Sequence, residues 1–528
     1  MLVLAPVRAC PMNAPPRKPC STLFALAAIC LGLLACAPGA AAVEAEAPLP
    51  AAPAPAAPPV PLPVEVTLST AGPGRPVPAR FLGLSFEAQA LDQLGALAGR
   101  GDLVTLLRSL GPGLIRFGGI TADQNVAWTD PLTPRPAWAT STIGPAQMKA
   151  LGALARRSGW GVLLTVGMAH YEPEAAAREV ASARAALGSR LVAVEVGNEP
   201  DAYGRHGFRP LPWIAQGYEE QVTQYREAIA RLVPGVPLAG PDVSGSGIFP
   251  EWGFAEGASQ APLMLTGHHY PLGCAQTPPP SIETLLSPAI RGREAQSLET
   301  YLSISRPQGI PFRMDETNSV SCGGVPGISN TFASALWAAG YVGEAMAAGI
   351  VGVNLQGNPT NCAGYTPLCA PDAPALAAGR LRAQPDWYAL LLTRSLIGSR
   401  PLLTTIASTG APNLAAYGFA GPNHTRKLLL VDDEAPGSSP LAVRAPLGPG
   451  FGVARVVRLT GPSLTATTGV SLGGRAVPAS REFVEPAVGE HATLRGGVLS
   501  LRLEPASAAL VTVASAPKKK PRRRHRRH

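Results

Sequence analysis

The sequence predicts an α/β fold: a (β/α)8 TIM barrel with a C-terminal antiparallel β-sandwich domain. At 528 residues the chain is too long for one compact core, so two folded units are expected. Eight short apolar runs alternate with helical patterns over about 300 residues, which is the strand number and size of a (β/α)8 barrel. From about Pro401 to Val513 the pattern changes to short alternating runs separated by Gly, Pro and Asn, which is typical of a sandwich.

The elements are assigned from these runs. The predicted barrel strands are Phe81–Glu87, Gly113–Phe117, Gly161–Gly167, Leu191–Val196, Val236–Gly240, Leu263–Gly267, Ile310–Met314 and Ile350–Gln356. Predicted helices include Gln147–Arg157, Pro173–Leu187, Trp213–Leu232, Thr331–Ala348 and Trp387–Leu396. The run Val64–Ser69 alternates like a half-buried strand, so we expect it to pair into the sandwich. The predicted segments are an export signal (1–42), a Pro/Ala-rich linker (43–63), an N-terminal strand (64–80), the barrel (81–398), the sandwich (399–515) and a basic tail (516–528).

The N-terminus has the features of a bacterial export signal. Arg17 and Lys18 precede an apolar run, Leu23–Cys36, which is short for a membrane span and is followed by small residues. This pattern predicts a secreted, periplasmic or cell-surface protein. The end of the run also resembles a lipoprotein cleavage box, and in that interpretation Cys36 would be lipidated and would attach the protein to a membrane.

The net charge of +9 gives little information about partners. Eight of the Lys and Arg residues lie in the last twelve residues, so the rest of the chain is nearly neutral and a nucleic-acid-binding fold is not indicated. A run of this kind is usually a solvated, disordered segment. Its functional interpretation is contact with acidic polymers or an anionic surface, which salt would weaken.

Four cysteines lie in the predicted exported body: Cys274, Cys322, Cys362 and Cys369. An even number in an oxidising compartment predicts two disulfides, and four cysteines allow three pairings. Cys362 and Cys369 are close enough in sequence to close one loop, which leaves Cys274 for Cys322. No metal site is predicted, because no Cys-x-x-Cys pair occurs and the adjacent pair of histidines suits few metals.

Two glutamates are candidates for acid–base and nucleophilic chemistry. Glu199 follows the fourth predicted strand, between Asn198 and Pro200, and Glu316 follows the seventh. Active sites of (β/α)8 barrels lie at the C-terminal ends of the strands, and cleavage of a glycosidic bond requires two carboxyl groups. Asp315 competes with Glu316 for the nucleophile role, but strand alternation predicts that the two side chains point to different faces.

Several motifs in this order resemble glycoside hydrolase family 79, the β-glucuronidase and heparanase group of retaining (β/α)8-barrel enzymes. The matching strings are Leu114-Ile-Arg-Phe-Gly-Gly119 with Thr121 and Asp123, Val196-Gly-Asn-Glu-Pro-Asp201, Gly267-His-His-Tyr-Pro271, and Asp315-Glu-Thr-Asn-Ser319 with Gly323-Gly324 and Ser329-Asn-Thr-Phe-Ala333. The resemblance extends from about Val64 to Val513. The Asn-Glu-Pro motif alone marks only the wider clan of related families.

The resemblance implies an exported retaining β-glucuronidase that acts on a glucuronic-acid-containing glycan or glycoside without a cofactor. It implies that Glu199 is the acid/base and that Glu316 is the nucleophile, hydrogen-bonded by Tyr270. Implied ligands of the sugar hydroxyls are Glu87, Asp123, Asn198 and Gln356, and implied ligands of the uronate carboxylate are the backbone at Gly323 and Gly324 and the phenol of Tyr365. A Cys274–Cys322 bridge would hold the carboxylate-binding loop in place.

Other interpretations of the same residues stay open. His268, His269 and Arg116 are expected to support the site and not to contact substrate. Another retaining glycosidase of the clan, acting on a neutral sugar, would not need the carboxylate-binding loop. A non-catalytic polysaccharide-binding surface protein would keep the barrel, but the presence of both glutamates argues against it.

Overall fold

The computed structural model describes residues 59–478, 480–485 and 489–516. The predicted export signal, the linker up to residue 58 and the basic tail from residue 517 lie outside the described residues. Among helices of the described part, none is both long enough and apolar enough to cross a membrane.

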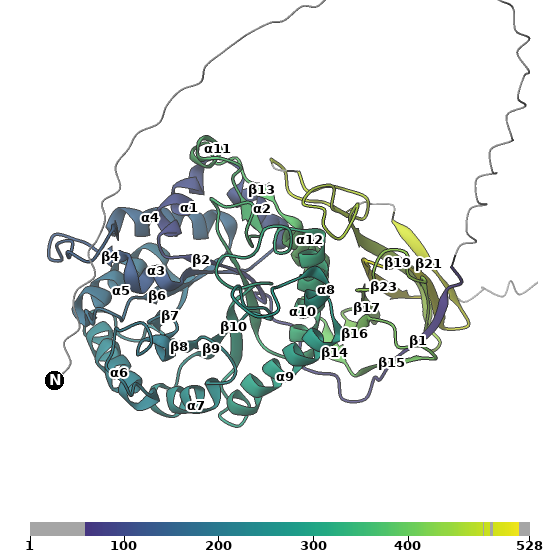
Figure 1. Cartoon of the computed structure of the whole chain (residues 1–528), viewed down its shortest axis with the longest axis horizontal. Helices are drawn as coiled ribbons and strands as arrows, with labels where there is room; N and C mark the ends of the chain where they lie inside the picture. Colours follow the sequence, from purple (N-terminus) through teal and green to yellow (C-terminus); the bar gives the residue numbers. More distant parts are fainter. Residues whose placement is uncertain (1–58, 479, 486–488, 517–528) are drawn as a thin grey trace, which may run out of the picture. The chain divides into compact units, whose positions relative to one another are not determined.

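The predicted fold class is confirmed: eight parallel strands form a barrel surrounded by helices (Figure 1). The strands are β2 (Leu82–Glu87), β3 (Leu114–Gly118), β6 (Gly161–Val166), β7 (Leu191–Val196), β8 (Ala239–Val243), β9 (Met264–His269), β10 (Phe312–Thr317) and β11 (Gly352–Gly357). Their order is β7-β6-β3-β2-β11-β10-β9-β8. A single bridge between Val194 and Leu238 joins β7 to the segment just before β8 and closes the barrel.

Helices connect successive strands and cover the barrel with their apolar faces. They are α1 (Ala90–Gly95), α2 (Leu103–Leu110), α4 (Pro145–Ser158), α5 (Pro173–Leu187), α6 (Ala215–Leu232), α7 (Phe249–Gln260), α9 (Pro288–Ser305), α10 (Phe332–Ala348) and α12 (Pro385–Thr393). Shorter helices lie in the connections: α3 (Ile120–Gln124), α8 (Ile282–Leu285) and α11 (Ala373–Ala377). Two small ladders, β4 (Val126–Trp128) with β5 (Ser141–Ile143) and β12 (Leu368–Cys369) with β13 (Arg382–Ala383), shape the loops after β3 and β11.

The remaining strands form the sandwich, which is antiparallel except where β1 pairs with β18. They are β1 (Leu62–Leu68), β14 (Arg400–Leu402), β15 (Thr404–Ser408), β16 (Leu414–Gly421), β17 (Thr425–Asp432), β18 (Leu441–Pro446), β19 (Phe451–Thr460), β20 (Ser471–Leu472), β21 (Glu490–Arg495), β22 (Val498–Leu503) and β23 (Ser507–Ser515). In Figure 1 the purple β1 lies among the later, green and yellow strands, where it pairs with β15 and β18. Buried aliphatic side chains such as Val66, Leu430 and Val511 fill the core of the sandwich.

The largest boundary error falls on the fifth barrel strand. The predicted strand ends at Gly240, just before Pro241, a residue that has no N–H to donate to a ladder. In the structure β8 continues to Val243, and its pairing with β9 shifts between Gly240 and Val243. The irregular pairing accommodates the proline. It also brings Asp242 into the barrel.

Candidate active site

The polar residues predicted as catalytic meet at the C-terminal ends of the barrel strands. Glu199 follows β7 in a left-handed backbone conformation, with φ 45°, which a non-glycine residue rarely adopts. Its N–H donates to the Asp242 carbonyl oxygen at 3.0 Å, so the end of β8 holds the turn. Glu316 lies on β10 itself and is 7% exposed.

The two glutamates are neighbours. A carboxylate oxygen of Glu199 and one of Glu316 lie within 4.8 Å of each other. Glu316 accepts hydrogen bonds from the Tyr270 hydroxyl at 2.8 Å and from Arg116 Nη1 at 2.7 Å. The side chain of Glu199 is 29% exposed and that of Glu316 is 10% exposed, so Glu199 is the more accessible of the two.

Arg116 on β3 is the buried centre of the site. Its guanidinium contacts four carboxyl groups: Glu195 at 3.0 Å, Asp242 at 2.7 Å, Asp315 at 3.1 Å and Glu316 at 2.7 Å. It also donates to Asn198 Oδ1 at 2.9 Å. The predicted supporting role agrees with these contacts, because Arg116 is fully buried beneath the two glutamates.

The expected separation of Asp315 from Glu316 is wrong. Both side chains reach the same guanidinium. The reason is a register shift in β10 between Met314 and Thr317, which breaks strict alternation and turns two consecutive carboxyl groups inward. Asp315 lies beneath Glu316 and accepts the Gly267 N–H at 2.9 Å.

Burial and the two basic side chains, Arg116 and His268, shift the pKa values of the carboxyl groups in this cluster. Burial, reinforced by Asp242 and Glu195, raises the pKa of Asp315 well above its usual value, which favours its neutral form. Although burial opposes it, Arg116 and His268 hold the pKa of Asp242 below its usual range. Arg116 therefore contacts two carboxyl groups whose pKa values are shifted in opposite directions.

His268 links the two halves of the site. Its Nδ1 lies 2.9 Å from Glu199 Oε1, and its Nε2 lies 2.8 Å from Asp242 Oδ1. Although burial opposes it, Glu316 and Asp242 raise the pKa of His268 well above its usual value. His268 is therefore an imidazolium that donates from both nitrogens.

The residues implied as sugar ligands lie at different depths. Glu87 ends β2 and accepts from both the N–H and the hydroxyl of Thr121. Asp123 is 2% exposed, and its carboxylate accepts four hydrogen bonds from the protein, including the Asn198 N–H at 3.0 Å and the Tyr203 hydroxyl at 2.6 Å. Gln356 is 2% exposed, and its Oε1 has no hydrogen-bond partner among the described residues. Asp123 is thus bound by the loops, whereas Gln356 keeps an unused acceptor.

The residues implied as carboxylate ligands come together from two loops. Tyr365, in the loop after β11, places its hydroxyl 3.3 Å from the Tyr270 hydroxyl. Its N–H donates to the Gly323 carbonyl at 3.0 Å. The Gly324 N–H closes a turn onto Ser321 at 3.2 Å, whereas the Gly323 N–H has no hydrogen-bond partner within the described residues. The Gly323 amide and the Tyr365 phenol are the donors left for a ligand.

Among the described residues, two groups of side chains have ligand atoms close enough to hold a metal ion. They are Glu199, His268 and Glu316, and Asp242, His268 and Asp315. Both include His268, which is protonated and donates from both nitrogens. Both ring nitrogens of His268 already pair with carboxylates, 2.9 Å from Glu199 and 2.8 Å from Asp242, and these contacts are those of a hydrogen-bonded acid–base cluster.

Asp242 and Glu195 are site residues that are absent from the predicted set. The predicted fifth strand stops at Gly240 and so leaves Asp242 in a loop. Glu195 lies within the apolar run of β7, is fully buried and contacts Arg116. A charged residue inside such a run is a signal that could have found it, because a buried charge requires a partner.

The geometry can be compared with known proteins. No protein-family model matches the chain. A β-glucuronidase from Aspergillus niger is 29% identical over 174 residues, covering 29% of this chain and 32% of that protein. The chain thus spans about a third of the length of this curated relative.

Solved structures are similar over a larger part of the chain. A 4-O-α-L-rhamnosyl-β-D-glucuronidase from Fusarium oxysporum has a TM-score of 0.68 at 20% identity, covering 85% of this chain and all of that one. A GH51 arabinofuranosidase from Xanthomonas axonopodis pv. citri has a TM-score of 0.62 at 15% identity, covering 86% of this chain and all of that one. The fold is that of the glycosidase barrels. At these identities the likeness concerns architecture, and the chemistry depends on the residues of the site.

Proposed function

We propose that this protein is a retaining glycoside hydrolase that releases β-linked glucuronic acid. The observation that carries the proposal is the carboxylate pair, with oxygens of Glu199 and Glu316 within 4.8 Å. Retaining glycosidases keep their two carboxyl groups about 5 Å apart, and inverting enzymes need a wider gap for a water molecule. The similarity to the Aspergillus niger β-glucuronidase supports the substrate class.

The contacts of the two glutamates support a different role for each. Glu316 is the nucleophile, because Arg116 and Tyr270 both donate to its carboxylate and hold it in place. Burial and the Glu316 charge raise the pKa of Tyr270 well above its usual value, so Tyr270 remains a donor. Glu199 is more exposed and protonates the leaving oxygen.

The reaction then follows in two displacements. Glu316 attacks the anomeric carbon while the proton of Glu199 passes to the departing oxygen, leaving a covalent glycosyl-enzyme. Glu199, now a carboxylate, takes a proton from water, and that water attacks the anomeric carbon and frees Glu316. The imidazolium of His268, 2.9 Å from Glu199, stabilises the carboxylate between the two steps.

Recognition of a uronate is assigned to neutral donors. The Gly323 N–H and the Tyr365 phenol would bind the carboxylate of the sugar without adding a cation near the acid/base. Burial raises the pKa of Tyr365 above its usual value, so its hydroxyl keeps its proton and can donate throughout the neutral pH range. A glucuronic-acid-containing glycan or glycoside is thus the proposed substrate.

We place the protein outside the cytoplasm, secreted, periplasmic or at the cell surface. The two disulfides are consistent with export into an oxidising compartment.

Substitution of the two glutamates tests the mechanism. Glu316→Gln should abolish release of 4-nitrophenol from its β-glucuronide, and Glu199→Gln should lower kcat/KM by about 10²–10⁴-fold. Azide should rescue Glu199→Ala with an activated substrate and yield the β-glycosyl azide, because azide replaces water in the second displacement. Glu299→Gln, an exposed change on α9, is the matched control.

Three results would contradict the proposal. Full activity of Glu316→Gln would remove Glu316 from the nucleophile role. A panel of aryl glycosides in which the wild type cleaves only xylosides, arabinosides or other neutral sugars would reject the uronate assignment. Binding of polysaccharide without any release of reducing sugar would favour a non-catalytic protein.

A further inference from the structure

Two disulfides lie in the loops that carry the proposed carboxylate ligands. Cys274–Cys322 links the loop after β9 to the loop after β10, next to Gly323. Cys362–Cys369 closes a loop after β11, and Tyr365 lies inside it. Both bonds are therefore placed beyond the C-terminal ends of barrel strands, on the face of the barrel that holds Glu199 and Glu316.

The loops after β10 and β11 touch through their backbones. Besides the hydrogen bond from Tyr365 N–H to Gly323, a Cβ added to Gly364 would come within 2.1 Å of the Gly323 carbonyl oxygen. A Cβ on Gly324 would come within 2.4 Å of the Tyr365 nitrogen. The close approach requires glycine on both sides, so a movement of either loop changes the other.

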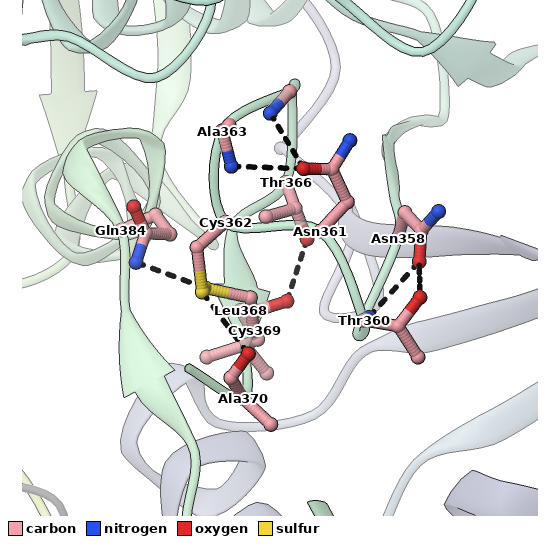
Figure 2. The surroundings of a disulfide bond; sticks show 11 residues. Asn358, Thr360, Asn361, Cys362, Ala363, Thr366, Leu368, Cys369, Ala370 and Gln384 are labelled. Atoms are coloured by element: carbon pink, nitrogen blue, oxygen red, sulfur yellow. Dashed lines mark hydrogen bonds between the residues drawn. A yellow bond between two sulfur atoms is a disulfide. The ribbon is translucent and has the colours of Figure 1, made fainter. Parts of the chain in front are cut away.

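The Cys362–Cys369 bond adds a covalent cross-link to a turn that is otherwise held by hydrogen bonds (Figure 2). Cys369 is fully buried on β12, where its sulfur accepts a hydrogen bond from Gln384. On the other side of the turn, the Asn361 side chain accepts the N–H groups of Ala363 and Gly364, which shapes the turn but does not attach it to the barrel. The disulfide is a second covalent link, besides the main chain, between the start of this turn and the buried strand β12.

The phenol held by this turn is directed at the reacting groups. Tyr365 is 8% exposed, and its hydroxyl lies 3.3 Å from Tyr270, which donates to Glu316 at 2.8 Å. After burial, the charge of Glu316 is the largest cause of the raised pKa of Tyr365, which agrees with a place at the wall of the same site. The position of Tyr365 therefore determines which substituent of a sugar bound at Glu316 this wall of the site can accept.

We infer that the Cys362–Cys369 disulfide is a specificity-determining element, which holds the Tyr365 phenol and the Gly323 amide in position for the substrate carboxylate. The inference rests on the proposed uronate specificity. Breaking the bond releases the turn and loses carboxylate recognition, while the barrel and the glutamate pair remain. A dithiol reductant would do this by thiol–disulfide exchange: each cysteine sulfur gains an electron and a proton, and the dithiol becomes a disulfide.

The test compares Cys362→Ser with the wild type on 4-nitrophenyl β-glucuronide and β-glucoside. The half-buried Cys362 tolerates a serine, and the buried Cys369 keeps the sulfur that Gln384 contacts. We expect the glucuronide-to-glucoside ratio of kcat/KM to fall at least about tenfold, mainly through KM, because the lost contact is to a charged group remote from the reacting bond. Ala363→Ser, an exposed change in the same turn, should keep the wild-type ratio.

A second variant separates positioning from a general loss of structure. Tyr365→Phe retains both disulfides and should lower the ratio to a similar extent, and the double variant Cys362→Ser/Tyr365→Phe should show little further loss, because both changes remove one interaction. An unchanged ratio in Cys362→Ser, or fully additive losses, overturns the inference. If the wild type cleaves only neutral glycosides, the proposed function fails as well, so the two failures are distinguishable.

Discussion

At the residue scale, His268 controls the charge around the proposed acid/base. Its imidazolium faces Glu199 and Asp242 within hydrogen-bond distance, with Glu316 and Asp315 each 3.9 Å away. Arg116 lies behind Asp242 and fixes that carboxylate. A positive charge 2.9 Å from Glu199 stabilises the carboxylate that this side chain becomes after it protonates the leaving oxygen.

Replacing His268 should therefore move one limb of the pH profile. His268→Gln keeps hydrogen-bonding capacity but removes the charge, so the alkaline limb of kcat/KM should shift upward by about one pH unit. His269→Gln is the control, because burial lowers the pKa of His269 to about 4 and it carries no charge in the working range. The profiles are measured with 4-nitrophenyl β-glucuronide. Identical profiles for wild type and His268→Gln would contradict the charge role.

At the element scale, irregular strands place the site. The register shifts in β8 and β10 bring Asp242 and both Asp315 and Glu316 to Arg116, which regular alternation would not do. The helices also carry buried carboxyls that the site does not use. Glu179 on α5 faces a cavity of about 30 Å³ beside Trp128, and burial raises its pKa to about 8.

Glu179 should make the stability of the fold depend on pH. In the unfolded chain this carboxyl releases its proton near the ordinary glutamate pKa of 4.5, whereas the folded protein retains the proton up to about pH 8. The contribution of Glu179 to the free energy of unfolding is therefore full below pH 4.5. It is lost as the pH rises from 4.5 to about 8. Glu179→Gln removes this loss. Urea unfolding at about pH 5 and pH 8.5 should show the variant gaining on the order of 2–4 kcal/mol over wild type at the higher pH.

A glutamate on the same helix is the control for this measurement. Glu174 is 62% exposed and paired with Arg231, so Glu174→Gln should give no comparable gain as the pH rises. A Glu179→Gln variant whose stability runs parallel to that of the wild type between these pH values would show that Glu179 is ionised in the folded protein.

At the scale of the whole molecule, one face of the sandwich shares a core with the barrel, while the interior of the sandwich forms a second apolar cluster. Helices α10 and α12 of the barrel pack on sandwich strands, and the cluster of buried apolar residues includes Leu336 and Trp387 together with Tyr417, Leu429 and Leu510. Arg291 adds an ion pair to Asp433 across this contact at 2.8 Å. The sandwich therefore supports the barrel on the side of α10.

Two glycines on α10 provide a matched test of this contact. A Cβ on Gly343 would come within 2.7 Å of Leu429 and Tyr417, whereas a Cβ on Gly340 would meet nothing within 4 Å. Gly343→Ala should lower the free energy of unfolding by about 1–3 kcal/mol through overpacking. Gly340→Ala should raise it by about 0.5–1 kcal/mol through helix propensity. Thermal unfolding measures both, and equal effects would show that the contact does not constrain the helix.

Local sequence patterns were enough to predict the elements and to mark the candidate catalytic residues. Apolar runs and helical periodicity predicted the barrel, because burial imposes a pattern on each strand and helix, and the Asn-Glu-Pro and Asp-Glu motifs marked Glu199 and Glu316. The tertiary structure alone decided which groups share one environment. Register shifts turn Asp315 inward and bring Asp242 into the barrel. The buried Glu195 finds its partner because strands far apart in the chain meet around Arg116. The periodicity of a local sequence shows which side chains are buried. The pKa of a carboxyl group, however, depends on all the charges around it, and the closed barrel brings those charges together from distant parts of the chain.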